Sequence, residues 1–97
     1  MGIIVSTRIL EKLARKHNVK KDEVAQCFAN RSGRYLRDPR AKHQTNPPTQ
    51  WFIAETDYGR RLKVVFILAG SDVEIKSAFE PNADEVRIYI KYGGGTI

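Results

Sequence analysis

The sequence predicts an α+β domain in which two N-terminal helices pack on a small antiparallel sheet and a C-terminal helix closes the chain. Three observations predict it: helical spacing of apolar residues before residue 30, alternation after residue 49, and a helix-capping pattern before the last apolar segment. With 97 residues, 41% hydrophobic and 29% charged, the chain has the size and composition of one globular domain. We therefore expect residues 1–97 to form a single domain.

Two helices are expected first. Residues 7–17 place apolar side chains on one face and charged ones largely opposite, and Ser6 or Thr7 can cap the start. Residues 21–29 repeat the helical spacing, with acidic residues in the first turn and Cys27 on the apolar face. Because the chain has one cysteine, we expect an inert core thiol and a reducing compartment, the cytoplasm.

The next segment, residues 31–50, fits neither a helix nor a central strand. It has no period for a buried face, and its prolines interrupt both structures. A connection of this length inside a compact domain is typical of a functional loop. We interpret it as a long basic loop that joins the helices to the sheet. Its cations are Arg31, Arg34, Arg37, Arg40 and Lys42.

Three strands are expected next. Residues 50–56, 61–69 and 73–79 alternate between apolar and polar side chains, and tight turns separate them. Short connections of this kind predict an antiparallel meander. In the third strand we expect one shared face for alternate residues, namely Val73, Ile75, Ser77 and Phe79.

The last segment, residues 83–92, admits two interpretations. Its β-branched and aromatic residues favour a strand. Asn82 and Glu85, however, form a capping box, and Gly93 stands where a helix would end. We favour a helix, followed by a flexible tail at residues 93–97. One face of that helix would hold Val86, Tyr89 and Ile90.

The net charge of the chain indicates what kind of partner it binds. A net charge of +6 and a pI near 9.7 favour an acidic partner, such as a nucleic acid or an acidic protein. No apolar run approaches the length of a membrane span. Two histidines and one cysteine make no zinc pattern, and the chain has no glycine-rich phosphate loop or nucleophile elbow. We therefore expect no metal, no cofactor and no membrane.

A set of basic and aromatic side chains surrounds the predicted sheet. Metal-free cleavage of RNA needs a base for the 2′-hydroxyl, a cation for the phosphate charge and an acid for the leaving oxygen. Histidine, lysine, arginine and tyrosine can supply these roles without a cofactor. The candidates for this chemistry are His17, His43, Arg60, Lys63, Arg87 and Tyr89.

Other members of the set are candidates for nucleic-acid contact. These are Trp51, Lys76 and the cations of the basic loop. Structural alternatives stay open for several residues: the lysines can belong to solvated faces, and His17 can cap a helix end. Tyr89 can pack in the core, and Trp51 can anchor the loop against the sheet.

Four motifs, taken in order, resemble BrnT-type toxins. KHNVKKDEV resembles their Lys-His-Gly-Val segment, GRRLKVVF their Gly-Arg-x-Leu-x-Val-Val strand, EIKSAF their Ile-x-Ser-Ala strand end, and EVRIY their Glu-x-Arg-x-Tyr helix. The resemblance covers nearly the whole chain except residues 31–50. It implies a RelE-like fold, a ribonuclease that blocks translation, and a cognate antitoxin encoded beside it. The site residues that it implies are His17, Arg60, Arg87 and Tyr89.

Two further comparisons qualify this resemblance. Phe79 stands where BrnT-like proteins have an arginine, and their aromatic-x-Trp-Asp start is missing. The stretch from His43 to Phe52 reads His-x-Thr-x-Pro-Pro-Thr-x-Trp-Phe. It resembles short bacterial proteins labelled ADP-ribosyl-(dinitrogen reductase) hydrolase.

Three functions follow as hypotheses. The first is a toxin-like, metal-independent endoribonuclease in which either histidine is the base or acid, Arg60 and Lys63 hold the phosphate, and Tyr89 is an auxiliary acid. The second is a non-catalytic module that binds RNA or an acidic protein, which Phe79 in place of arginine favours. The third is a hydrolase that acts on an ADP-ribosyl-type substrate.

Overall fold

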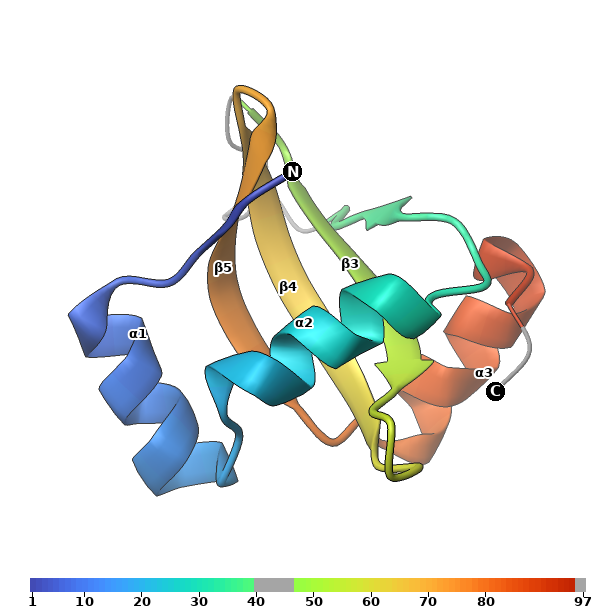
Figure 1. Ribbon diagram of the computed structural model, residues 1–97. Coiled ribbons are helices and arrows are strands. Elements are labelled where there is room, and N and C mark those ends of the chain that lie inside the picture. Colours follow the sequence, from blue (N-terminus) through green and yellow to red (C-terminus); the bar gives the residue numbers. More distant parts are fainter. Residues whose placement is uncertain (40–46, 96–97) are drawn as a thin grey trace.

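The computed structural model describes residues 1–39 and 47–95, and over these residues the fold is α+β, as the sequence predicts (Figure 1). Strands and helical segments follow one another in the order β1 (Ile3–Ile4), α1 (Thr7–Lys12), η1 (Leu13–His17), α2 (Lys21–Asn30), β2 (Leu36–Arg37), β3 (Thr49–Glu55), β4 (Arg61–Ala69), β5 (Asp72–Phe79) and α3 (Ala83–Gly93). No helix among the described residues is long and apolar enough to cross a membrane.

The described strands form one mixed sheet of order β1-β5-β4-β3-β2. Strands β3, β4 and β5 make the predicted antiparallel meander. The two outer strands were not predicted. β1 pairs in parallel with β5 through Ile3 and Ile4, and β2 pairs with β3. The interpretation of residues 31–50 as wholly without regular structure is therefore wrong at Leu36 and Arg37, and also at Thr49 and Gln50, which begin β3.

The first two helical segments lie where the sequence predicts them. The hydroxyl of Ser6 accepts a hydrogen bond from the amide of Ile9, which caps α1. α1 continues into η1, a π-helical turn that ends when Asn18 adopts a left-handed conformation with φ of 53°. Asparagine tolerates this conformation better than most residues do. The chain then reverses and enters α2.

Helices α2 and α3 cover opposite faces of the sheet. The ring of Phe28 on α2 lies 4.7 Å from that of Phe52, and the ring of Tyr89 on α3 lies 5.7 Å from that of Trp51. Trp51 and Phe52 are neighbours in β3, and neighbouring strand residues point to opposite faces. The α2 face holds most of the buried core. Its strand residues include Phe52, Ala54, Leu62, Val64, Phe66, Val73, Ile75 and Ala78.

A β-bulge at Lys76 changes the side-chain pattern of β5. Val65 pairs with Ser77 and Phe66 with Ile75, so Lys76 has no partner across the ladder. Beyond this extra residue the alternation is inverted. Ala78 is fully buried on the α2 face. Phe79 lies on the other face of the sheet, where it is paired with Lys63 of β4. The predicted shared face of Val73, Ile75, Ser77 and Phe79 is therefore wrong.

The last segment is a helix, as favoured from its capping box. Asn82 accepts from the amide of Glu85, and the Glu85 carboxylate accepts from the amide of Asn82. Tyr89 and Gly93 are buried against the rest of the fold, but Ile90 is 52% exposed. Ile90 was expected on the same face as Val86 and Tyr89, but its side chain is not buried with that of Tyr89.

The end of α3 packs closely on the segment that leaves α2. The amide of Arg34 donates to the carbonyl of Gly93 over 2.9 Å. A Cβ on Gly33 would lie 2.5 Å from the Tyr89 hydroxyl, so only glycine allows this approach. Gly93 thus belongs to α3 and not to a flexible tail, the start of which was expected at this residue.

Candidate functional site

The ring of Phe79 lies close to two basic side chains, on the sheet face that α2 does not cover. The imidazole of His17 is centred 5.5 Å from it, and the ammonium of Lys63 lies 5.7 Å from its centre. His17, Lys63 and Phe79 are each half-buried, so each presents part of its side chain to solvent. We refer to these three residues as the Phe79 site.

Lys63 is fixed in this site by two contacts. Its ammonium lies 2.7 Å from a carboxylate oxygen of Glu85 on α3 and 4.4 Å from the centre of the Trp51 ring. The side chain of Lys63 is only 12% exposed, so its position is determined by the sheet and by α3. Cation–π contacts of this kind add to the ion pair. Lys63 therefore extends from the strand in a defined direction beside Phe79.

His17 ends η1, which packs against β5 and brings the imidazole close to Phe79. Burial lowers the pKa of its imidazole, and the positive charges of Lys16 and Lys12 lower it further. His17 is consequently neutral at pH 7, with one ring nitrogen free to accept a proton. Among the described residues, no side chain forms a hydrogen bond with this ring, so that part of the chain supplies no partner for relayed proton transfer.

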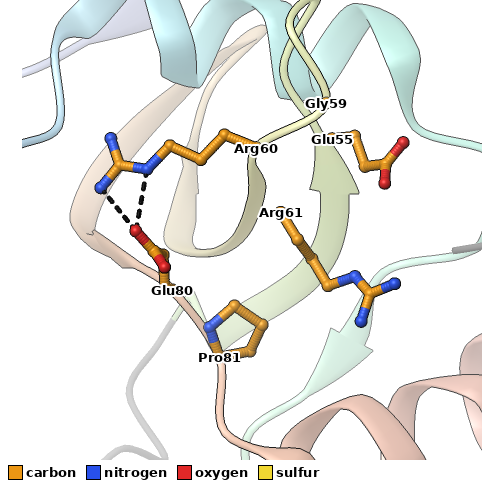
Figure 2. Close-up of a pocket in the computed structure, with 6 residues that line it drawn as sticks. All are labelled: Glu55, Gly59, Arg60, Arg61, Glu80 and Pro81. Carbon is orange, nitrogen blue, oxygen red and sulfur yellow. Dashed lines mark hydrogen bonds and ion pairs between the residues drawn. The ribbon is translucent and has the colours of Figure 1, made fainter.

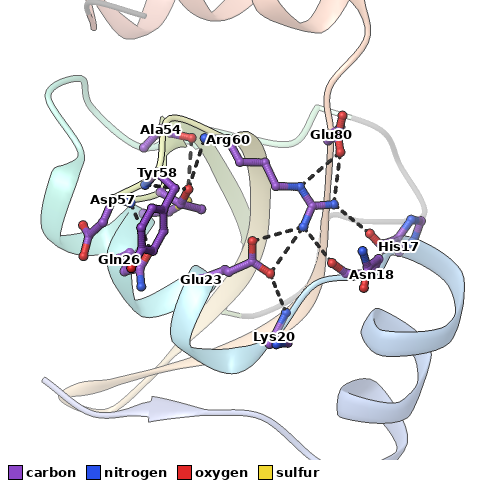
Figure 3. Close-up of polar contacts among 12 residues, drawn as sticks. His17, Asn18, Lys20, Glu23, Gln26, Ala54, Asp57, Tyr58, Arg60 and Glu80 are labelled. Atoms are coloured by element: carbon purple, nitrogen blue, oxygen red, sulfur yellow. Dashed lines mark hydrogen bonds and ion pairs between the residues drawn. The ribbon is translucent and has the colours of Figure 1, made fainter.

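Arg60, a predicted phosphate contact, is surrounded by protein acceptors (Figure 3). Its Nη1 donates to the carbonyl of Asn18 over 2.7 Å and to the carboxylate of Glu23 over 3.1 and 3.3 Å. Nη2 donates to the carbonyl of His17 over 2.9 Å, and Nε donates to Glu80 over 3.1 Å. All three nitrogens of the guanidinium therefore already have partners, which is the pattern of a structural residue.

The adjacent Arg61 differs from Arg60 in this respect. Its Nε is buried and has no hydrogen-bond partner, and no described residue forms an ion pair with its guanidinium. Arg61 lines an open surface cavity of about 400 Å³ between the β3–β4 turn and the end of β5 (Figure 2). The other lining residues are Glu55, Gly59, Arg60, Glu80 and Pro81.

Two further catalytic candidates have structural surroundings. Tyr89 is fully buried, and its hydroxyl donates to the carbonyl of Arg34 over 2.9 Å. Burial raises the pKa of this phenol, which makes it a poorer proton donor near neutral pH. Arg87 forms an ion pair with Asp84 on the outer side of α3, and both side chains are more than 70% exposed, at 72% and 73%.

The predicted nucleic-acid contacts are spread over several parts of the fold. Arg31 stacks its guanidinium 4.1 Å from the centre of the Tyr35 ring and bonds to the carbonyl of Gly33. Trp51 is buried, with 7% exposed, so it anchors α3 and Lys63 rather than offering a free ring. The remaining described candidates, all exposed, are Arg34, Arg37 and Lys76, the last bonded to Glu74 over 2.9 Å.

Arg40, Lys42 and His43, also predicted as site residues, lie outside the described residues. The structure thus brings His17 and Lys63 together. It gives Arg60 and Tyr89 structural contacts, and it places Arg87 on an exposed helix surface.

The cysteine does not offer a reactive thiol, and the described acidic residues do not gather into a metal site. Cys27 is fully buried, and its thiol contacts the carbonyl of Ala54 at 3.6 Å. Burial raises the pKa of this thiol to about 12, so it stays protonated and inert, as expected. Within residues 1–39 and 47–95, no three His, Cys, Asp or Glu side chains gather into a possible metal site.

Comparison with known proteins adds no family assignment. No protein-family model matches the chain, and no curated protein is significantly similar to it.

Sequence reasoning missed two residues of this region. Phe79 was assigned to the core face because the bulge at Lys76 leaves no mark in the apolar alternation. Arg61 belongs to the basic set around the predicted sheet but was not chosen as a site residue, because the Gly-Arg motif of the resemblance points to Arg60. The one signal in the sequence was the alternation of β4, which already places Arg61 and Lys63 on the same face.

Proposed function

We propose that this protein binds single-stranded RNA at the Phe79 site without cleaving it. The observation that carries the proposal is the half-buried Phe79 ring, which has an imidazole centred 5.5 Å away and an ammonium group 5.7 Å from its centre. Aromatic rings that stack bases, next to cations that attract the backbone, are the common device of proteins that bind single strands.

The charge distribution around the site supports this proposal. The whole chain carries a net charge of +6. Lys12 and Lys16 lie close enough to His17 to lower the pKa of its imidazole, which places positive potential at the edge of the site. Phosphodiester backbones bind such regions with an affinity that falls as salt is added.

The contacts of the catalytic candidates favour binding over cleavage. Cleavage of RNA needs a base, an acid and a free cation around one phosphate. Arg60 is held by Glu23, Glu80 and two backbone carbonyls, and Tyr89 is buried. Among the described candidates, His17 is a partly exposed imidazole without a hydrogen bond to a described side chain, and a single group does not complete the set.

Binding of a fluorescent oligouridylate in EDTA, followed by anisotropy, tests the proposal. Phe79→Ala is expected to weaken binding about tenfold or more, because base stacking on an aromatic ring contributes roughly 1–3 kcal/mol per base. Tyr58→Ala is the matched control, because Tyr58 is an aromatic residue that is 93% exposed on the β3–β4 turn and is not one of the three residues of the Phe79 site. If the native protein does not bind the oligonucleotide, or if both variants bind equally well, the proposal is wrong.

A second candidate function is a metal-independent endoribonuclease of the toxin–antitoxin type. One observation favours it: the imidazole of His17 is half-buried beside Phe79 and has no hydrogen bond to a described side chain, so that a ring nitrogen could accept a proton from a bound ligand. This candidate predicts RNA cleavage in EDTA that His17→Gln abolishes. It also predicts that expression arrests growth and that the product of an adjacent gene relieves the arrest. Intact RNA and normal growth would exclude it.

A further inference from the structure

Two adjacent arginines at the start of β4 have opposite surroundings. The guanidinium of Arg60 forms hydrogen bonds or ion pairs with His17, Asn18, Glu23 and Glu80. The guanidinium of Arg61 has no described partner, although its Nε is buried. We infer that Arg61, and not Arg60, holds a backbone phosphate of the bound RNA, an inference that rests on the proposed function.

The first argument is the unsatisfied donor. A buried N–H group without a partner costs free energy, and native structures pair nearly all such groups with protein, water or a ligand. Arginine presents its donors as a planar fork that matches the oxygens of a phosphate. An anion bound at Arg61 would supply the acceptor that the described part of the protein does not supply.

The second argument is access. Arg61 lines the open cavity of about 400 Å³ together with Gly59 and Pro81, which places its guanidinium within reach of a ligand (Figure 2). In the same view the guanidinium of Arg60 is turned toward Glu80, and that of Arg61 extends away from both. A phosphate of a single strand is small enough to enter this cavity beside Arg61.

The third argument is position relative to the Phe79 site. Arg61 and Lys63 alternate on β4, so their side chains leave the same face of the sheet about 7 Å apart along the strand. Lys63 lies opposite Phe79 in the ladder. A nucleotide whose base stacks on Phe79 therefore has Arg61 within one backbone step. The aromatic ring and the guanidinium would hold adjacent parts of the same strand.

Two carboxylates line the same cavity and bear on its affinity for anions. Glu80 is already paired with Arg60 over 3.0 Å, which neutralises much of its charge. Glu55 is exposed and lies opposite Arg61 in the ladder. Its charge opposes an incoming phosphate, so Glu55→Gln should strengthen RNA binding. The inference therefore predicts higher RNA affinity in Glu55→Gln and lower RNA affinity in Arg61→Gln.

The experiment measures binding of a fluorescent oligouridylate to the full chain at several salt concentrations. Arg61→Gln is expected to weaken binding about tenfold, the loss of one charge-assisted contact. The slope of log K against log salt should also fall by about 0.7, the value for one phosphate contact in a single strand. Lys21→Gln removes the same charge on α2, over the opposite face of the sheet, and is expected to leave both quantities unchanged.

The possible results distinguish a failure of the Arg61 assignment from a failure of the proposed RNA binding. If the native chain binds no RNA, the proposed function fails first. If it binds RNA and Arg61→Gln binds equally well with the same salt slope, only the assignment of Arg61 is overturned. Circular dichroism of Arg61→Gln must match that of the native chain. If Arg61→Gln is misfolded, Glu55→Gln decides, since a phosphate at Arg61 requires tighter binding in that variant and unchanged affinity overturns the assignment.

Discussion

The Nη2 atom of Arg60 donates a hydrogen bond to the backbone carbonyl of His17 over 2.9 Å, which ties the start of β4 to the end of the first helical segment (Figure 3). The same guanidinium reaches Glu23 on α2 and Glu80 after β5. One side chain thus connects the start of β4 with the end of η1, with α2 and with the segment that follows β5. The position of His17 beside Phe79 depends on this connection.

Replacing Arg60 is expected to affect stability more than it affects the chemistry of binding. Arg60→Gln should lower the free energy of unfolding by about 2 kcal/mol, because it removes charge-assisted hydrogen bonds and leaves two carbonyls without their donor. Urea unfolding followed by circular dichroism measures this. Arg61→Gln is the matched control and should stay within about 0.5 kcal/mol of the native chain, because the guanidinium of Arg61 has no described partner to lose. Equal losses in both variants would contradict the structural role of Arg60.

The imidazole of His17 is expected to titrate below 6.5, the value for an unfolded chain, because burial and then Lys16 and Lys12 lower its pKa. The unfolded chain then binds the proton more tightly than the folded chain. The stability due to His17 is therefore fully present above pH 6.5 and is lost as the pH falls through the lowered pKa. NMR titration of the ring, assigned with His17→Gln, measures the value. Lys16→Gln should raise it, and a pKa unchanged in that variant would contradict the coulombic contribution.

Tyr89 is expected to act in packing and not in chemistry. Tyr89→Phe keeps the ring against Trp51 but removes the hydroxyl that donates to the carbonyl of Arg34. This should cost about 1 kcal/mol of unfolding free energy. RNA affinity, and any RNA cleavage, should not change. A variant of native stability that loses cleavage would instead identify Tyr89 as a proton donor.

The contact between Gly33 and α3 should be intolerant of a side chain. A Cβ at this position would lie 2.5 Å from the Tyr89 hydroxyl and 2.8 Å from the carbonyl of Gly93. Gly33→Ala is therefore expected to lower the free energy of unfolding by about 1–3 kcal/mol, the usual cost of overpacking. Thermal unfolding measures it. Gly59→Ala tests the alternative of a backbone effect, because Gly59 has a φ of 81° but open space around it.

Much of the fold follows from periodicity and capping. Each of these elements buries one face, so its apolar residues recur with a clear period. This holds for the helical spacing of residues 7–17 and 21–29 and for the alternation of residues 61–69. The box of Asn82 and Glu85 outweighed the strand propensity of the residues after it, because it satisfies two backbone donors at the start of α3.

The parts that escaped prediction are set by tertiary contacts. β1 and β2 have two residues each, too few for any period, and exist only because a neighbouring strand pairs with them. The difference between Arg60 and Arg61 is of the same kind. Both residues are arginines. Only the positions of Glu23, Glu80 and the carbonyl of His17 determine which of the two guanidinium groups has protein partners.

The bulge at Lys76 has a consequence for comparing this chain with others. In a relative that lacks the extra residue, the positions that point to each face of the sheet would be shifted by one residue after residue 76. An ungapped alignment would then set Phe79 against a residue of the other face, and the two would be compared as equivalents when they are not. Placing a one-residue gap in β5 is therefore the condition for judging whether the aromatic ring is inherited or particular to this protein.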